Sequence, residues 1–194
     1  MLDVVQRWVD LGDDVSRKLG FITPTVMTVF EFFLEDPMRE YHEREVVRRT
    51  GVSKGSAGKI LKLLASLDFL TREEKGRMAI YKLNLKEPTV RQFKILVNIF
   101  ALKNLLDKLR QFSRKVVFFG SCSQGTDAKE SDIDLLIITT EKEWVRKITS
   151  EFNQENERKV APVVVSMNEY VLLRKEDRPL YENIERGVVL WEAE

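Results

Sequence analysis

The chain has 194 residues, of which 43% are hydrophobic, and this is enough to form the core of one domain or of two small ones. Its 32 basic and 31 acidic residues nearly balance, which excludes a global attraction to nucleic acid or to an anionic membrane. The single cysteine, Cys122, excludes an internal disulfide.

No run of about 18 apolar residues is present that could span a bilayer. The N-terminus carries acidic residues where a signal peptide would have a basic start followed by an unbroken apolar stretch. We therefore expect a soluble, cytoplasmic protein that does not contact a membrane.

The first predicted element is an amphipathic helix over residues 2–19 that ends at Gly20. Its apolar residues recur at helical spacing: Val5, Trp8, Val9, Leu11 and Val15. We assign this helix to packing or to dimerisation, so a homodimer stays open.

Three helices and a hairpin are predicted next. Thr23-Pro24 favours a helix start at Pro24, and Asp36-Pro37 stops that helix after Leu34. Helices over 42–50 and 54–68 follow, the first closed by Gly51 and the second capped by Ser53. Strands over 69–74 and 78–83 form the hairpin, with residues 74–77 at its basic tip.

This order, together with the stretch VVRRTGVSKGSAGKILKLLASLDFL, resembles the winged helix-turn-helix domains of prokaryotic transcription regulators. The resemblance covers about residues 23–84 and implies DNA as a partner. Residues 44–62 contain six basic side chains and one acidic one, which suits contact with phosphates. The alternative is a winged helix that makes only protein contacts.

The residues expected to contact DNA are Ser53, Lys54, Ser56, Lys59, Lys62, Lys75 and Arg77. They lie on the third helix and at the tip of the hairpin. After this domain, residues 86–89 mark a boundary, and a long apolar helix capped by Thr89 is predicted through about Arg110.

The stretch KVVFFGSCSQGTDAKESDIDLLIITT begins at Lys115 and contains two apolar strands, 116–119 and 133–138, separated by turn-forming residues. Asp132 and Asp134 are two positions apart, so on a strand their carboxylates point to the same face and repel one another. A divalent cation such as Mg²⁺ removes that cost. The Gly120-Ser121 corner offers backbone N–H groups and a hydroxyl to phosphates.

An apolar strand, Gly-Ser, ten further residues and Asp-Ile-Asp resemble the signature of the polymerase-β-like nucleotidyltransferases, and Gly125 lies where the minimal members have a second glycine. The resemblance implies catalytic, Mg²⁺-binding aspartates at Asp132 and Asp134. It also implies nucleotide contacts at Gly120, Ser121 and Gly125, and ATP or another NTP as substrate.

The family generally adds a third carboxylate on a later strand, to bind the metal that activates the acceptor. The matching strand of this chain, residues 159–166, contains no acidic residue. This departure leaves open whether transfer occurs.

Further elements are a crossover helix over 141–152, a strand over 160–165, short helices over 168–174 and 179–185, and a last strand over 188–191. The predicted fold class is α+β, with an N-terminal winged helix-turn-helix followed by a small mixed-sheet nucleotidyltransferase domain. The predicted divisions are an N-terminal helix (1–22), the winged helix (23–86), a connecting helix (87–114) and the nucleotidyltransferase domain (115–194).

Two functions follow from these patterns. The first is Mg²⁺-dependent transfer of a nucleoside monophosphate, AMP by preference, from an NTP to a hydroxyl; the resemblance implies that a toxin-like protein partner could carry that hydroxyl. The second is a non-enzymatic, DNA-binding transcriptional regulator whose degenerate nucleotidyltransferase domain only binds nucleotide or mediates assembly.

Overall fold

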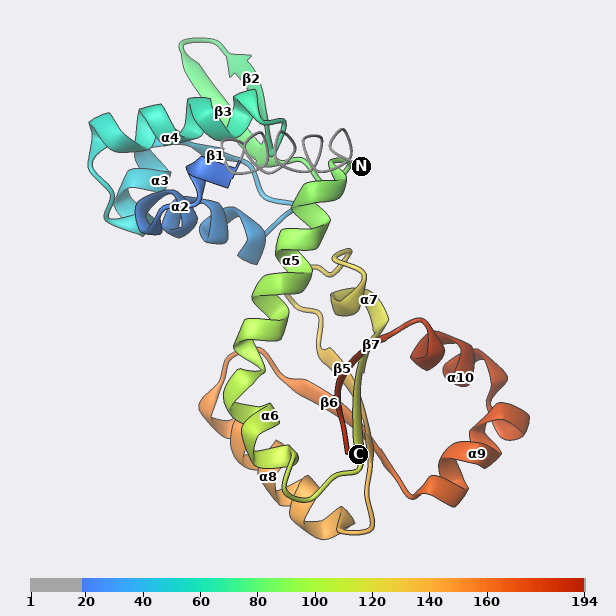
Figure 1. Cartoon of the computed structure of the whole chain (residues 1–194). Coiled ribbons are helices and arrows are strands. Elements are labelled where there is room, and N and C mark those ends of the chain that lie inside the picture. Colours follow the sequence, from blue (N-terminus) through green and yellow to red (C-terminus); the bar gives the residue numbers. More distant parts are fainter. Residues whose placement is uncertain (1–18, 194) are drawn as a thin grey trace, which may run out of the picture. The chain divides into compact units, whose positions relative to one another are not determined.

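The structure, a computed structural model, describes residues 19–193 (Figure 1). The helix predicted for residues 2–19, with Trp8, lies almost entirely outside the described residues. The chain divides into two compact units, Met1–Leu83 (unit 1) and Asn84–Glu194 (unit 2). Helices and two separate sheets make up a mixed α+β fold, as predicted.

The described part of unit 1, residues 19–83, has three α-helices followed by a hairpin, in the predicted order. Its described elements are η1 (Leu19–Phe21), α2 (Pro24–Glu35), β1 (Tyr41–His42), α3 (Glu43–Thr50), α4 (Lys54–Ser66), β2 (Leu70–Lys75) and β3 (Met78–Leu83). The two-residue strand β1 is absent from the prediction. It pairs with β3, so the antiparallel sheet has the order β1-β3-β2.

The ends of these helices form through the local interactions that the sequence indicates. The Ser53 hydroxyl accepts a hydrogen bond from the Ser56 N–H (3.2 Å) at the start of α4. Gly51 closes α3 with a φ of 71°, a left-handed conformation that suits glycine. The helices then bury one apolar face each, and the fully buried side chains among them include Val29, Phe30, Phe33, Val46, Ala57, Leu61 and Leu64.

Alanine substitutions at two glycines of unit 1 should change the stability of the protein in opposite directions. Gly51→Ala should destabilise the protein by about 1–2 kcal/mol, because an alanine in the left-handed region brings its Cβ too close to the following carbonyl oxygen. Gly58→Ala, inside α4, should stabilise it by roughly 0.5–1 kcal/mol, because its added Cβ meets only the flexible Glu43 side chain at 3.4 Å. Urea unfolding followed by far-UV circular dichroism measures both changes. Equal effects of the two substitutions would contradict this account.

Unit 2 is a four-stranded sheet with helices on both faces. Its elements are α5 (Pro88–Ala101), α6 (Lys103–Leu109), β4 (Lys115–Phe119), α7 (Gly120–Ser123), β5 (Ile133–Ile138), α8 (Lys142–Glu155), β6 (Val160–Val165), α9 (Met167–Glu176), α10 (Arg178–Glu185) and β7 (Val188–Glu192). The strand order is β6-β5-β4-β7, with β5 and β6 parallel through the crossover helix α8 and the other pairs antiparallel.

Alternate residues of the central strands β4 and β5 face two apolar clusters. Leucines of α6 and residues of α8 pack on the face that carries Val116, Phe118 and Leu135. Residues of α9 and α10 cover the other face, which carries Leu136 and Ile138. Figure 1 shows α6 and α8 on one side of this sheet and α9 and α10 on the other.

The prediction of one helix over 89–110 is wrong in two respects. The helix is divided at Leu102, whose N–H bonds to both the Asn98 and Ile99 carbonyls in a tight turn, and this turn brings the leucines of α6 onto the sheet. The predicted cap, Thr89, is wrong as well, because it lies inside the helix. Pro88 suits the first helical position, and Glu87 caps the helix by accepting a hydrogen bond from the Thr89 N–H (3.1 Å).

Within the described part of the chain, residues 19–193, we find no helix with the length and hydropathy needed to cross a membrane.

Candidate functional site

The corner after β4 brings the predicted glycine and carboxylate together. Phe119, the last residue of β4, pairs with Asp134 in β5, so Gly120 follows directly beside that carboxylate. Gly120 has a φ of 74°, and a Cβ at this position would collide with the Asp134 carboxylate. Glycine is therefore required here both by the backbone conformation and by the close approach of Asp134.

The two predicted metal ligands lie at the start of β5. Asp132 is exposed and directly precedes the strand, whereas Asp134 is half-buried within it. Burial, and then repulsion by Asp132, raises the pKa of the Asp134 carboxyl. No ion pair with a Lys or Arg of residues 19–193 relieves this repulsion. An exposed and a half-buried carboxylate, without a basic partner in the described part of the chain and beside a glycine that leaves Asp134 room, fit a divalent cation.

The remaining predicted nucleotide contacts lie in the same loop. Ser121 is half-buried in the single helical turn α7, where the prediction had only a loop. Gly125 is buried with a φ of 66°, and a Cβ there would collide with the backbone carbonyl of Arg91 in α5. Packing against α5 thus explains the need for glycine at residue 125, and a nucleotide contact there stays a prediction.

The strand beside β5 does not provide the third carboxylate that the family resemblance implies. In the parallel pairing, Ala161 of β6 is the register partner of Asp134 and lies on the same face of the sheet. Val163 follows on that face and packs into the apolar cluster. Among the described residues, no group of three or more His, Cys, Asp or Glu side chains is arranged to hold a metal ion.

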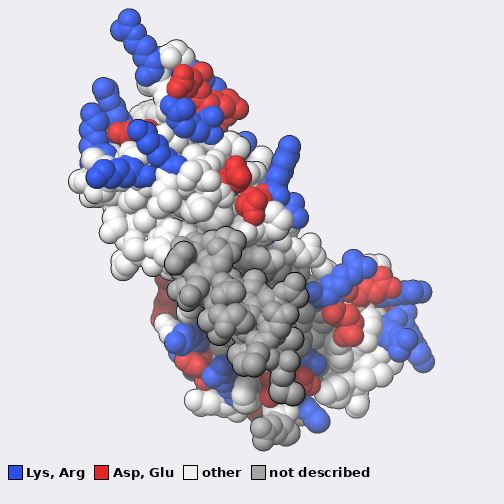
Figure 2. Space-filling view, turned by 45° about the horizontal axis from the view of Figure 1, so that its top comes forward, with Lys and Arg blue, Asp and Glu red and all other residues white. Residues whose placement is uncertain are grey.

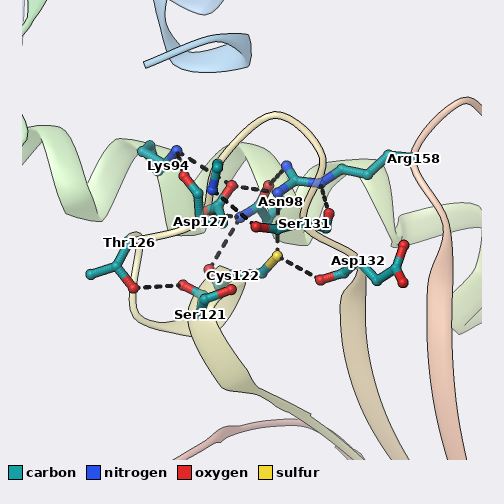
Figure 3. A network of polar contacts seen from close by, with 10 residues as sticks. Lys94, Asn98, Ser121, Cys122, Thr126, Asp127, Ser131, Asp132 and Arg158 are labelled. Atoms are coloured by element: carbon teal, nitrogen blue, oxygen red, sulfur yellow. Dashed lines mark hydrogen bonds and ion pairs between the residues drawn. The ribbon is translucent and has the colours of Figure 1, made fainter. Parts of the chain in front are cut away.

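Sequence reasoning missed a buried polar network behind this site (Figure 3). Asp127 and Lys94, each 2% exposed, form an ion pair with a separation of 3.3 Å. Arg158 also pairs with Asp127, and it donates a hydrogen bond to the Asn98 side chain (2.7 Å). The signals available in the sequence were a lysine and an asparagine at apolar positions of a predicted helix.

Cys122 belongs to this network and is unsuited to act as a nucleophile. It is fully buried, and its thiol donates to the backbone carbonyl of Asp132 (3.1 Å). Burial raises the pKa of the Cys122 thiol to about 11, so the reactive thiolate is disfavoured at neutral pH. These contacts indicate that Cys122 is chemically inert at neutral pH.

In unit 1, the predicted DNA-contacting residues differ in their availability. The side chains of Lys54, Lys59, Lys62 and Arg77 are exposed, whereas Lys75 forms an ion pair with Glu40 (2.6 Å). Ser53 and Ser56 are exposed and half-buried, respectively, and hydrogen-bond to each other (3.0 Å) in the cap of α4.

A hollow in unit 1 brings three cationic side chains together. Arg44, from the start of α3, Lys54, from the start of α4, and Arg77, at the hairpin, line it together with His42 and neutral residues of β3; Glu43 is the acidic residue in its wall. Figure 2 shows basic side chains over this part of the chain, interrupted by acidic ones. Arg44 belongs to the basic stretch of residues 44–62, but it is not one of the residues predicted to contact DNA.

Comparisons with known proteins agree with the site in unit 2. Residues 102–186, less than half of the chain, match the family model described as nucleotidyltransferase domain. The matched residues lie within unit 2 and include Gly120, Asp132 and Asp134. The search of curated proteins finds no significant match.

Two solved structures show weak similarity. A candidate nucleotidyltransferase from Sulfolobus solfataricus is 17% identical, with a TM-score of 0.38 over 56% of this chain and 92% of that one. The Mycobacterium tuberculosis protein Rv0081 is 16% identical, with a TM-score of 0.39 over 53% of this chain and 96% of that one. Similarities at this level support no conclusion about the fold or the function of this chain.

Asp134→Asn should stabilise the metal-free protein at neutral pH by on the order of 0.5 kcal/mol, a small value because the carboxylates are partly solvated. Since the folded-state pKa of Asp134 is raised, the charged carboxylate destabilises the fold above that pKa, and the cost disappears as the pH falls through it. The gain should therefore shrink at acidic pH. Urea unfolding at neutral and acidic pH without divalent cations measures it.

Asp107→Asn, an exposed acidic site in α6, is the matched control and should give no gain. A destabilised Asp134→Asn protein at neutral pH would show that the carboxylate has a stabilising partner and would contradict the repulsion argued here.

Proposed function

We propose that unit 2 binds a nucleoside triphosphate with Mg²⁺ and transfers a nucleoside monophosphate, AMP from ATP, to a hydroxyl group. The observation that supports this most directly is the juxtaposition of Gly120 with Asp134 inside a matched nucleotidyltransferase domain. The acceptor that we favour is a hydroxyl of a toxin-like protein partner, which rests on the family resemblance.

In this proposal Asp132 and Asp134 hold the cation, which, when bound, neutralises charge on the phosphates and orients them for in-line attack. Gly120 and Ser121 contribute N–H groups at the first turn of α7, where no intrahelical partner is available to them. Gly120 also keeps the corner open beside the carboxylate. Positioning and electrostatic stabilisation then provide most of the rate acceleration.

The test is incubation with Mg²⁺ and ATP labelled at the α-phosphate, or in parallel at the γ-phosphate, in the presence of the chain and cytosolic protein and RNA fractions. Transfer should leave the α-label, but not the γ-label, on an acceptor and release pyrophosphate. Asp132→Ala/Asp134→Ala should reduce labelling by at least about 100-fold, since both predicted metal ligands are lost. Asp107→Ala should label as the wild type does, and equal labelling by the double variant would contradict the proposal.

A second candidate function is supported by Ala161. Because the register partner of Asp134 on β6 carries no carboxylate, the site has no ligand on that strand for a metal that activates the acceptor. The chain would then be a regulator that binds nucleotide without consuming it. Nucleotide binding by calorimetry without pyrophosphate release, together with a nucleotide-dependent change in DNA affinity, would favour this function over transfer.

We further propose that unit 1 is a winged helix that binds DNA. Three helices, a hairpin and the grouping of Arg44, Lys54 and Arg77 around one hollow support this. The exposed lysines of α4 and the hairpin arginine would contact phosphates, while Lys75, already paired with Glu40, would contribute less. Contacts to phosphates do not depend on the bases, so the loss of one should weaken binding to every DNA sequence.

Lys59→Ala/Arg77→Ala should reduce the slope of log affinity against log salt by about 1.8 on a random-sequence duplex, since each lost phosphate contact removes about 0.9. Fluorescence anisotropy at several salt concentrations measures this slope. Arg174→Ala/Lys175→Ala, which removes two exposed charges from α9 in unit 2, is the control and should retain the wild-type slope. A wild type without salt-sensitive binding would make unit 1 a protein-interaction module.

A further inference from the structure

Arg158 lies just before β6 and contacts four other residues of unit 2. Its guanidinium pairs with Asp127 and donates hydrogen bonds to the Asn98 side chain (2.7 Å), the Cys122 sulfur (3.2 Å) and the Ser131 backbone carbonyl (3.2 Å). These partners belong to α5, to α7, to the loop after it and to the residue before Asp132 (Figure 3). One side chain thus connects α5, α7 and the loop of residues 124–132, here called the carboxylate loop.

Partners and neighbours of Arg158 hold the backbone at Asp132. The Cys122 thiol donates to the Asp132 carbonyl (3.1 Å), and the Ile133 N–H donates to the Lys159 carbonyl (2.8 Å). Figure 3 shows the Asp132 carbonyl directed at Cys122, while its carboxylate points away from the network. Arg158 therefore acts on the backbone beside the carboxylate and does not touch the carboxylate itself.

The centre of this network is a buried carboxylate with two cationic partners. Asp127 is 2% exposed and accepts from two cations, Arg158 and Lys94, and Lys94 is also 2% exposed. Loss of Arg158 would leave Asp127 paired with Lys94 alone and would remove the hydrogen bonds from the guanidinium to Asn98, Cys122 and Ser131. The planar fork of a guanidinium makes several directed hydrogen bonds at once, and a lysine ammonium on its flexible stem cannot replace it.

We infer that Arg158 is a positioning residue for the divalent cation held by Asp132 and Asp134. This inference rests on the proposed metal site of unit 2 and adds a residue to it that makes no contact with the cation. Outer partners of metal ligands commonly change metal affinity by about 10–100-fold when they are removed. We expect an effect at the lower end of that range.

The direction of the change in divalent-cation affinity distinguishes a positioning role of Arg158 from a purely electrostatic one. Removing a positive charge near two carboxylates should by Coulomb's law strengthen the binding of a divalent cation. Loss of positioning should weaken it. Lys159 provides a matched control, because it is the next residue and carries the same charge, but its ammonium bonds to the Asn153 and Asn156 carbonyls and not to the carboxylate loop.

The experiment is a Mn²⁺ titration, followed by electron paramagnetic resonance, of the full chain without nucleotide. Arg158→Gln and Arg158→Lys should each weaken Mn²⁺ binding by about tenfold, whereas Lys159→Gln should leave it unchanged or slightly tighter. Unfolding temperatures are measured in parallel, and titrations are run well below them. Arg158→Lys keeps the positive charge, so it tests the inference if Arg158→Gln does not fold.

Either Arg158 variant binding Mn²⁺ as tightly as the wild type, whatever its unfolding temperature, would overturn the inference and leave Arg158 as a stabilising residue only. That result would leave the proposed metal site intact. A wild type that does not bind Mn²⁺ would overturn the proposed metal site itself, together with the inference that depends on it.

Discussion

The geometry of the candidate site depends on the buried carboxylate of Asp127 and the two cations that pair with it. Burial lowers the pKa of Lys94, and attraction to Asp127 opposes that shift, so the pair offsets a cost that either charge alone would impose. Through these bonds the loop between β4 and β5 is fixed to α5 on one side and to the segment before β6 on the other. The loop that carries Asp132 is held by electrostatics, since it has little apolar surface of its own.

This dependence gives α5 a role that its position in the chain does not suggest. The nucleotidyltransferase match begins at residue 102, but Lys94 and Asn98, which hold the loop, lie before it. Gly125 also packs against the backbone of Arg91 in the same helix. The helix interpreted from sequence as a connector is thus part of the structure that shapes the site in unit 2, and a fragment starting at residue 102 would lack it.

Much of this fold could be predicted from local signals in the sequence, whereas pairings between distant residues could not. Caps such as Ser53 and Gly51, the strands around Gly120 and the Asp132 and Asp134 pair are recognisable because their chemistry acts over a few neighbouring residues. The division at Leu102 was not predictable, because no glycine or proline marks it and it arises from packing of the following leucines on the sheet. Nor was the partnership of Lys94 with Asp127, since the two residues are 33 positions apart and a lysine in a helix is usually solvated.

Acidic and basic side chains are separated within the site, and this separation bears on the proposed binding of a cation. The pKa of Asp134 is raised by burial and by Asp132, and neither Arg158 nor Lys94 is among its causes, because Asp127 engages both of them. Positive side chains therefore support the backbone of the loop without neutralising its carboxylates. Had Arg158 paired with Asp132 directly, the site would be satisfied within the protein and a divalent cation would have to displace it. Because Asp127 engages both cations, Asp132 and Asp134 have no Lys or Arg partner in the described part of the chain.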